Sequence, residues 1–351
     1  MLLGQFLQKK ALERGVRYQS CHVTHATLDE RGDIASVSTR EGETHAADVF
    51  VDCSGFASLL IEKALHTPYV SFAENLFNDA AVALPTPMDE RIPCETVSTA
   101  LKHGWAWKIP LTSRFGNGYV YSSRFCDAEA AERELREHLG LLDADVPARH
   151  LKMRIGRVAQ HWNRNCLAVG LSQGFIEPLE ATALLFIQQT ATTFTDFLER
   201  GDWSEDAHRT FNAMINGHFE GIRDYIVTHY KTNTRSDTDY WRANAANLNL
   251  SDELKKLYSL WMTGKSIVPG VRHQKIGRGY PVFSWFALMA GMGVFPDAPD
   301  LRPPTAQEAR YRMTEIDNLI GRSAANFPDH KRTLAGIPPR RREPALQAYF
   351  W

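Results

Sequence analysis

Two short apolar runs, each ending at a glycine, place the strongest constraint on how this chain can fold. The first runs from Ala47 to Asp52 and continues into Cys53-Ser54-Gly55, and the second runs from Asn165 to Gly170. Continuous apolar runs are typical of strands buried on both faces. Ligand crevices in such sheets lie at the carboxyl ends of the strands. The pattern predicts an α/β fold whose glycine turns let backbone approach a ligand, although a tight turn into a helix would need the glycine as well.

The second run leads into the segment 174–189, which predicts a buried helix that begins near Pro178. Proline is favoured at a first helical position, and the carboxylates of Glu177 and Glu180 would meet the positive end of the helix dipole. A strand, a loop and a helix N-terminus in this order present unpaired backbone N–H groups to an anion. The residues alone nevertheless favour a capped core helix over a functional site.

Hydrophobic periodicity predicts several further elements. A helix is expected from Leu2 to Arg14, ending at Gly15. Strands are expected over 17–28, 34–39 and 47–52, followed by a hairpin over 105–125 whose turn covers 113–118. Period two places Trp105 and Trp107 on one face of that hairpin, where core packing is the simplest role for them. Beyond residue 189 the pattern is helical to Lys265 and again over 283–292.

Composition excludes several classes of function. The 351 residues carry a formal net charge of −1, and the one short basic run, 340–342, does not resemble a nucleic-acid or membrane-binding footprint. Five widely spaced cysteines without a CxxC pair favour a reduced, cytoplasmic compartment over zinc binding. His22 and His25 lie on a predicted strand and point to opposite faces, so no metal site is expected. No run is long enough for a membrane span or typical of an export signal.

Three segments together resemble the flavin-dependent tryptophan halogenase family. Residues 50–56 (FVDCSGF) are similar to its flavin motif after a strand, and residues 104–110 (GWAWKIP) are similar to its WxWxIP signature, carried here by Trp105, Trp107, Ile109 and Pro110. Residues 168–180 (AVGLSQGFIEPLE) resemble the strand and loop that hold the flavin edge and the active-site glutamate.

The resemblance implies an FAD-dependent monooxygenase-like fold, of the p-hydroxybenzoate-hydroxylase type, with a mainly helical substrate module. It implies a partial flavin-binding region with a substrate-side sheet over 1–190, a helical module over 191–330 and a flexible tail over 331–351. The implied reaction uses FAD reduced by a separate flavin reductase, together with oxygen and halide. Hypohalous acid then halogenates an electron-rich, indole-like ring. A homodimer is left open.

The resemblance also implies roles for individual residues. Glu180 would orient the oxidant and take the ring proton, while Glu177 would be a capping or supporting acid. The implied halide contacts are the amides of Thr182 and Ala183. The implied flavin contacts are Val23, Gly55, Gly170, Leu171 and Leu184. Tyr280 and Phe283 would line the substrate pocket.

The sequence departs from the family pattern at several points. The family's FxxPxxSxG is kept at Phe175 and Pro178, but Ala181 replaces its serine and Ala183 its glycine. The residues that hold free tryptophan are not recognisable in 266–285, which favours another aromatic substrate. No GxGxxG follows a first strand, and neither Lys102 nor Lys108 matches the family's lysine by context. We therefore expect a truncated form of a longer protein.

Two alternatives stay open at this point. One is an aromatic monooxygenase of the same fold. The paired tryptophans Trp105 and Trp107 distinguish the two classes of enzyme, because in the halogenase family such a pair keeps the substrate away from the flavin. The other is a non-catalytic remnant or binding module, because the expected first FAD-binding segment is missing from the sequence.

Overall fold

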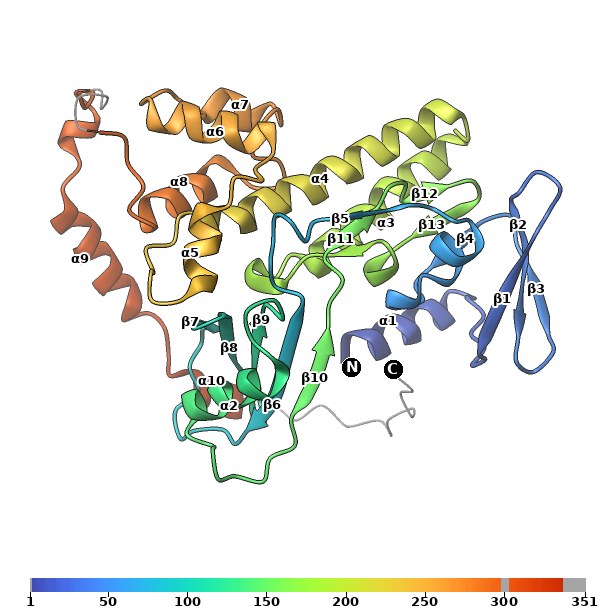
Figure 1. The fold of residues 1–351 in the computed structure, drawn as a ribbon, viewed down its shortest axis with the longest axis horizontal. Helices are drawn as coiled ribbons and strands as arrows, with labels where there is room; N and C mark the ends of the chain where they lie inside the picture. Colours follow the sequence, from blue (N-terminus) through green and yellow to red (C-terminus); the bar gives the residue numbers. More distant parts are fainter. Residues whose placement is uncertain (1, 298–302, 337–351) are drawn as a thin grey trace. The chain divides into compact units, whose positions relative to one another are not determined.

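The computed structural model describes residues 2–297 and 303–336, and its elements have the α/β content expected from the sequence (Figure 1). Contacts divide the chain into two compact units. Unit 1 combines the residues up to Phe72 with Arg154–Glu220, and unit 2 combines Ala73–Met153 with the described residues from Gly221 onward. The units therefore interleave along the sequence, which differs from the linear division expected at residue 190. The flavin-binding role expected for residues 1–190 and the substrate-covering role expected for residues 191–330 stay predictions.

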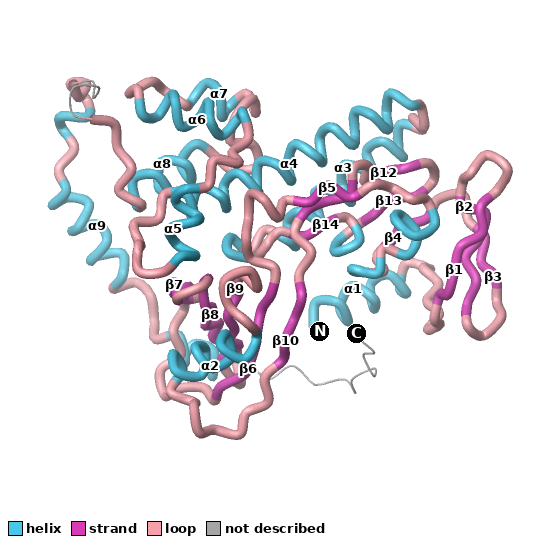
Figure 2. The backbone as a smooth tube through the Cα atoms, viewed as in Figure 1, coloured by secondary structure: helices cyan, strands magenta, loops and turns pink. Residues whose placement is uncertain are grey.

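Unit 1 contains three small sheets, drawn as magenta strands in Figure 2. The first is antiparallel, with the order β1-β2-β3. The second has the order β12-β13-β4, and the third has the order β14-β11-β5. Their bounds are Val23–Leu28 (β1), Ile34–Thr39 (β2), Thr44–Ala46 (β3), Phe50–Asp52 (β4), Tyr69–Ser71 (β5), Gly156–Val158 (β11), Trp162–Asn163 (β12), Cys166–Ala168 (β13) and Gly174–Phe175 (β14).

The strand pair β4 and β13 is parallel, with Cys166 opposite Phe50 and Ala168 opposite Asp52. Both strands run into short helical turns, η1 (Gly55–Ala57) and η3 (Gly170–Ser172). A longer turn, η2 (Leu59–Ala64), follows η1. Both apolar runs therefore form strands, as predicted, and the structure adds that these strands pair in parallel with their carboxyl ends at one edge.

Three longer helices belong to unit 1 in whole or part: α1 (Leu2–Glu13), α3 (Ala183–Arg200) and α4 (Glu205–Lys231), which continues into unit 2 (Figure 1). Helix α3 buries a single stripe made of Phe186, Thr190, Phe194 and Phe197. The rings of Phe194 and Phe197 pack edge-on against Trp162, which is itself 1% exposed. Aromatic pairs in this geometry contribute beyond their buried area.

Unit 2 is built on an antiparallel sheet with the order β10-β6-β9-β8-β7. The strands are β6 (Ala80–Thr86), β7 (Val97–Leu101), β8 (Gly104–Pro110), β9 (Phe115–Tyr121) and β10 (Arg149–Lys152). Helix α2 (Ala128–Leu139) packs Ala131 and Leu135 onto this sheet. Besides the end of α4, the described residues of unit 2 form α5 (Asp239–Ala246), α6 (Asp252–Met262), α7 (Val268–Arg272), α8 (Val282–Gly291), η6 (Glu308–Arg310), α9 (Met313–Ala324) and α10 (His330–Ala335).

Several predicted bounds are wrong. The expected strand from residue 17 begins only at Val23, and the hairpin turn lies between Pro110 and Phe115 because the Leu111 N–H bonds to the Arg114 carbonyl. The tail expected from residue 331 begins inside α10, and residues 337–351 lie outside the described residues. The helix predicted from Pro178 begins at Ala183.

Candidate functional site at the carboxyl ends of two parallel strands

Two glycine turns meet where β4 and β13 end. Gly55 and Gly170 have φ angles of +70° and +71°, a left-handed conformation that side chains rarely adopt. A Cβ added at Gly55 would meet no atom within 4 Å, and one added at Gly170 would meet only the Ile187 side chain at 3.8 Å. No neighbouring atom crowds the Cβ position of either glycine, so conformation rather than crowding requires the glycines.

The side chain of Asp52 organises the first turn. Its carboxylate is 1% exposed and accepts hydrogen bonds from the N–H and hydroxyl of Ser54 at 2.9 and 2.6 Å. It also accepts from the N–H groups of Leu60 and Ile61, each at 2.8 Å. A buried carboxylate needs such donors. Asp52 is not among the site residues predicted from the sequence, although a carboxylate that closes an apolar strand is a usable signal.

The segment after β13 makes a second turn before α3 begins. Pro178–Glu180 form a single 3-10 turn, η4, and Ala181 follows in the left-handed region with a φ of +53°. That conformation costs a residue with a Cβ on the order of 1 kcal/mol or more. Thr182 is the N-cap residue but makes no side-chain cap, and Ala183 is the first residue of α3. The first amides of α3 therefore have no partner within the helix.

The two glutamates differ in burial. Glu177 is 2% exposed, whereas Glu180 is exposed. Leu184 and Leu185 are 68% and 54% exposed, so the helix that the sequence predicted to be buried is buried along one stripe only. Periodicity indicates which residues share a stripe, but it does not tell how wide the covered face is.

The structure brings Gly55, Gly170 and Leu171 together, because η1 packs on η3, and η3 in turn contacts α3. Phe56 and Phe175 meet edge to face at 5.8 Å between ring centroids in the same region. Val23 opens β1, a different sheet of unit 1. The predicted flavin contacts on the two turns thus form one cluster. Val23 belongs to another sheet, in which β1 pairs with β2.

In unit 2, Trp105 and Trp107 lie on one face of β8 with 6.0 Å between ring centroids, as predicted. Ile109 and Pro110 complete the strand. Trp107 lies opposite Gly118 of β9. A Cβ added at Gly118 would lie 2.1 Å from the Cζ2 atom of Trp107. The ring therefore occupies the space above that glycine.

Tyr280 and Phe283, the residues predicted to line the substrate pocket, have different surroundings. The Tyr280 ring stacks on Tyr225 at 3.7 Å between centroids, and Tyr225 donates its hydroxyl to the Ser284 carbonyl at 3.1 Å. Phe283 is 75% exposed. Stacking gives Tyr280 a packing role that the sequence did not indicate.

Comparison with known proteins identifies the family. A profile of the tryptophan halogenase family matches residues 1–307. The chain belongs to the tryptophan halogenase family.

Two curated relatives illustrate the similarity. The chain is 40% identical over 344 residues to 7-chloro-L-tryptophan 6-halogenase KtzR of Kutzneria sp. (strain 744), covering 95% of this chain and 65% of the relative. It is 37% identical over 321 residues to tryptophan 6-halogenase SttH of Streptomyces toxytricini, covering 88% of this chain and 60% of that relative. The chain thus spans less than two thirds of the length of these relatives.

Solved structures agree with the fold. The crystal structure of SttH superposes with a TM-score of 0.85 at 36% identity, covering 95% of this chain and 66% of that chain. BrvH, a flavin-dependent halogenase from Brevundimonas sp. BAL3, superposes with a TM-score of 0.85 at 32% identity, covering 96% and 68%. The α/β class is therefore that of the flavin-dependent halogenases.

The residues at the two turns fit the flavin that this family implies. Glycine backbone without a side chain and the first amides of α3 are groups that can approach a planar ring and donate to its polar atoms. The buried thiol nearby is a poor nucleophile, since burial together with the charge of Asp52 raises the pKa of Cys166 to about 12. The edge is thus suited to binding a ring rather than to thiol chemistry.

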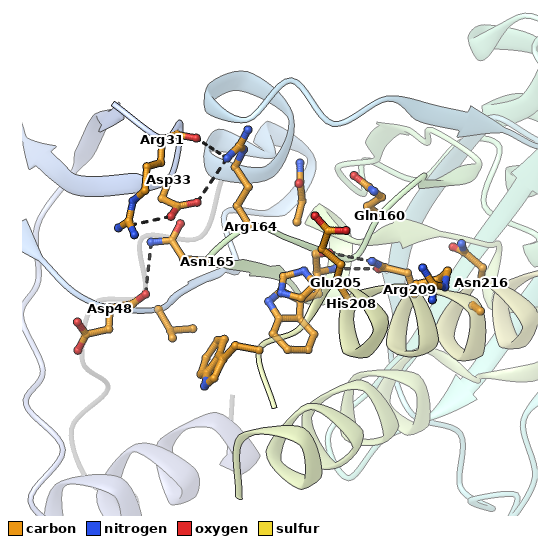
Figure 3. Close-up of a pocket in the computed structure, with 16 residues that line it drawn as sticks. Arg31, Asp33, Asp48, Gln160, Arg164, Asn165, Glu205, His208, Arg209 and Asn216 are labelled. Atoms are coloured by element: carbon orange, nitrogen blue, oxygen red, sulfur yellow. Dashed lines mark hydrogen bonds and ion pairs between the residues drawn. The ribbon is translucent and has the colours of Figure 1, made fainter. Parts of the chain in front are cut away.

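A separate cavity of about 1160 Å³ lies in unit 1 and contains none of the predicted site residues (Figure 3). At one end Arg164 donates to the Arg31 carbonyl and lies 3.6 Å from the Asp33 carboxylate. Along α4, the side chain of Asn212 accepts from the N–H groups of His161 and Trp162 and donates to the Trp162 carbonyl. These polar side chains already make hydrogen bonds and an ion pair that stabilise the fold.

The described residues contain no cluster of three or more His, Cys, Asp or Glu side chains able to hold a metal. Within the same residues, every helix is too short or too polar to cross a membrane.

Proposed function

We propose that this chain carries the halogenation site of a flavin-dependent halogenase that acts on an electron-rich, indole-like ring. Reduced FAD, supplied by a flavin reductase and oxidised by oxygen in the presence of halide, would provide hypohalous acid. The proposal includes the cytoplasmic location expected from the sequence and an aromatic substrate other than free tryptophan.

The observation that carries the proposal is the placement of Glu180. Its carboxylate is exposed one residue before the left-handed Ala181, and the amides of Thr182 and Ala183, at the start of α3 where no side chain caps the helix, follow directly. A carboxylate and anion-binding N–H groups within four residues suit a site that handles both halide and a proton. The halide would lie near the amides, and the carboxylate would lie near the ring.

The chemical step is a substitution on the ring. The halogen of hypohalous acid bonds to a ring carbon as its bond to oxygen breaks, and the hydroxide released takes up a proton to become water. The ring carbon then loses its own proton to the Glu180 carboxylate, which restores aromaticity. A base within hydrogen-bond reach typically contributes about 10²–10⁴-fold to such a step.

The test compares two isosteric variants in an assay with FAD, flavin reductase, NADH, oxygen, bromide and a panel of indoles. Glu180→Gln should lower turnover by about 10²–10⁴-fold. Because the side chain is exposed, its stability cost should stay within roughly the 0.3–1 kcal/mol of a helix-dipole interaction.

Glu177→Gln is the matched control, since it alters a buried carboxylate of the same loop. We expect a loss of about 1–3 kcal/mol in unfolding free energy and a much smaller loss of turnover. Loss of halogenation in the Glu177 variant with retention in the Glu180 variant would reverse the assignment. Hydroxylated product without bromide and no brominated product with it would favour the monooxygenase, and no product at all would favour a non-catalytic protein.

A further inference from the structure

The hydroxyl of Ser172 links the two glycine turns of the proposed flavin edge. Ser172 is the last residue of η3 and is 1% exposed. Its Oγ lies 3.2 Å from Oδ1 of Asp52 and 3.1 Å from the carbonyl oxygen of Gly55. Both acceptors belong to the segment that follows β4, whereas Ser172 belongs to the segment that follows β13.

The hydroxyl has one proton and two acceptors. Oδ1 of Asp52 already accepts two shorter bonds from Ser54, and the Gly55 carbonyl also accepts from the Ser58 N–H at 3.1 Å. Neither acceptor therefore depends on Ser172 for its own satisfaction. What the hydroxyl adds is a bond between the turns, besides the backbone bond from the Val169 N–H to the Asp52 carbonyl at 3.0 Å.

We propose that Ser172, acting through Asp52 and Gly55, is a positioning residue that fixes the separation of the Gly55 and Gly170 turns for flavin. The inference rests on the proposed function for its ligand, but its geometric part stands on this structure alone. Spacing matters here because two backbone segments that approach one planar ring must both be in place before it binds. Ordering them in advance reduces the entropic cost of binding.

The first measurement is amide hydrogen exchange of the full chain without ligand. Ser172→Ala should raise exchange both in residues 54–61 and in residues 169–174, because it removes the side-chain bond that joins them. Ser54→Ala is the control for local loosening. It removes the 2.6 Å bond to Asp52 and the acceptor of the Leu59 N–H at 2.8 Å, so exchange should rise in 54–61 only. An S172A variant with unchanged exchange in 54–61 would overturn the link.

The second measurement is titration with FAD, followed by flavin absorbance and fluorescence. Ser172→Ala should weaken binding roughly three- to tenfold, the size expected for one net hydrogen bond. The FAD affinity of Ser172→Cys, whose thiol is a weaker hydrogen-bond donor, should lie between the affinities of wild type and Ser172→Ala. Ser122→Ala is the control, since Ser122 is 0% exposed in unit 2 and its hydroxyl has no partner among the described residues. It should bind FAD as wild type does.

The outcomes separate the inference from the proposed function. Equal FAD affinity of wild type and S172A would overturn the positioning role and leave the proposed cofactor in place. A wild-type chain that takes up no FAD at any concentration would sink the proposed cofactor and the positioning role with it, while the exchange data would still decide whether the link exists.

Discussion

Replacing Gly118 tests whether the tryptophan pair is held by the space above one glycine. A Cβ there would lie 2.1, 2.2 and 2.7 Å from the Cζ2, Cη2 and Cε2 atoms of Trp107. Carbon atoms pack at about 3.5 Å or more. In Gly118→Ala the indole would therefore have to withdraw by roughly 1.4 Å or the strands would have to separate. Overpacking of this kind costs about 1–3 kcal/mol.

The matched control is Gly116→Ala in the same strand. Its Cβ would meet only Arg114 and Leu111 side-chain atoms, at 3.6 and 3.8 Å, which are ordinary contacts. Replacing glycine by alanine without strain stabilises by about 0.4–1 kcal/mol through the unfolded chain. Because both variants share this gain, we expect G118A to be less stable than G116A by about 1–3 kcal/mol.

Urea unfolding gives the two free energies, and near-UV circular dichroism reports the coupling of the Trp105 and Trp107 rings. G118A should lose part of the tryptophan signal, and G116A should retain it. If G118A were as stable as G116A and its near-UV spectrum were unchanged, Trp107 would not occupy the space above Gly118, and the account of the paired tryptophans would be wrong.

Two further predictions concern pH and cofactor uptake. Burial lowers the pKa of His161 to about 3 from its ordinary 6.5, because its 0% exposed ring stacks on Phe219 next to the Arg157 charge. Below pH 6.5 the unfolded chain binds a proton that the folded chain does not, so unfolding free energy should fall by up to about 1.4 kcal/mol per pH unit. Urea unfolding between pH 6.5 and 5 should show this slope in wild type and a shallower one in His161→Gln; equal slopes would contradict it. The purified 351-residue chain should bind FAD weakly, because its sequence has no GxGxxG turn after a first strand to hold the pyrophosphate. Tight, stoichiometric FAD with yellow absorbance on purification would refute that expectation.

The sequence alone indicated several of the local elements and the resemblance to the family. Period two placed Trp105 and Trp107 on one face, and the apolar runs ending at Gly55 and Gly170 predicted two strands, which the structure contains as β4 and β13. Helix ends were predictable at Gly15 and Gly293, which both have positive φ angles. These features depend on residues close together in the chain, whose conformational preferences a single sequence displays.

Only the tertiary structure decided which polar side chains are buried. Glu177 and Glu180 lie three residues apart with similar local signals, yet one is 2% exposed and the other is exposed. The first turns after Pro178 look helical in sequence, but Ala181 takes a left-handed conformation and delays α3 to Ala183. Asp52 and Ser172, 120 residues apart, meet because β4 and β13 pair in parallel. Burial and hydrogen-bond partners depend on such distant segments, and no local pattern encodes which of them will meet.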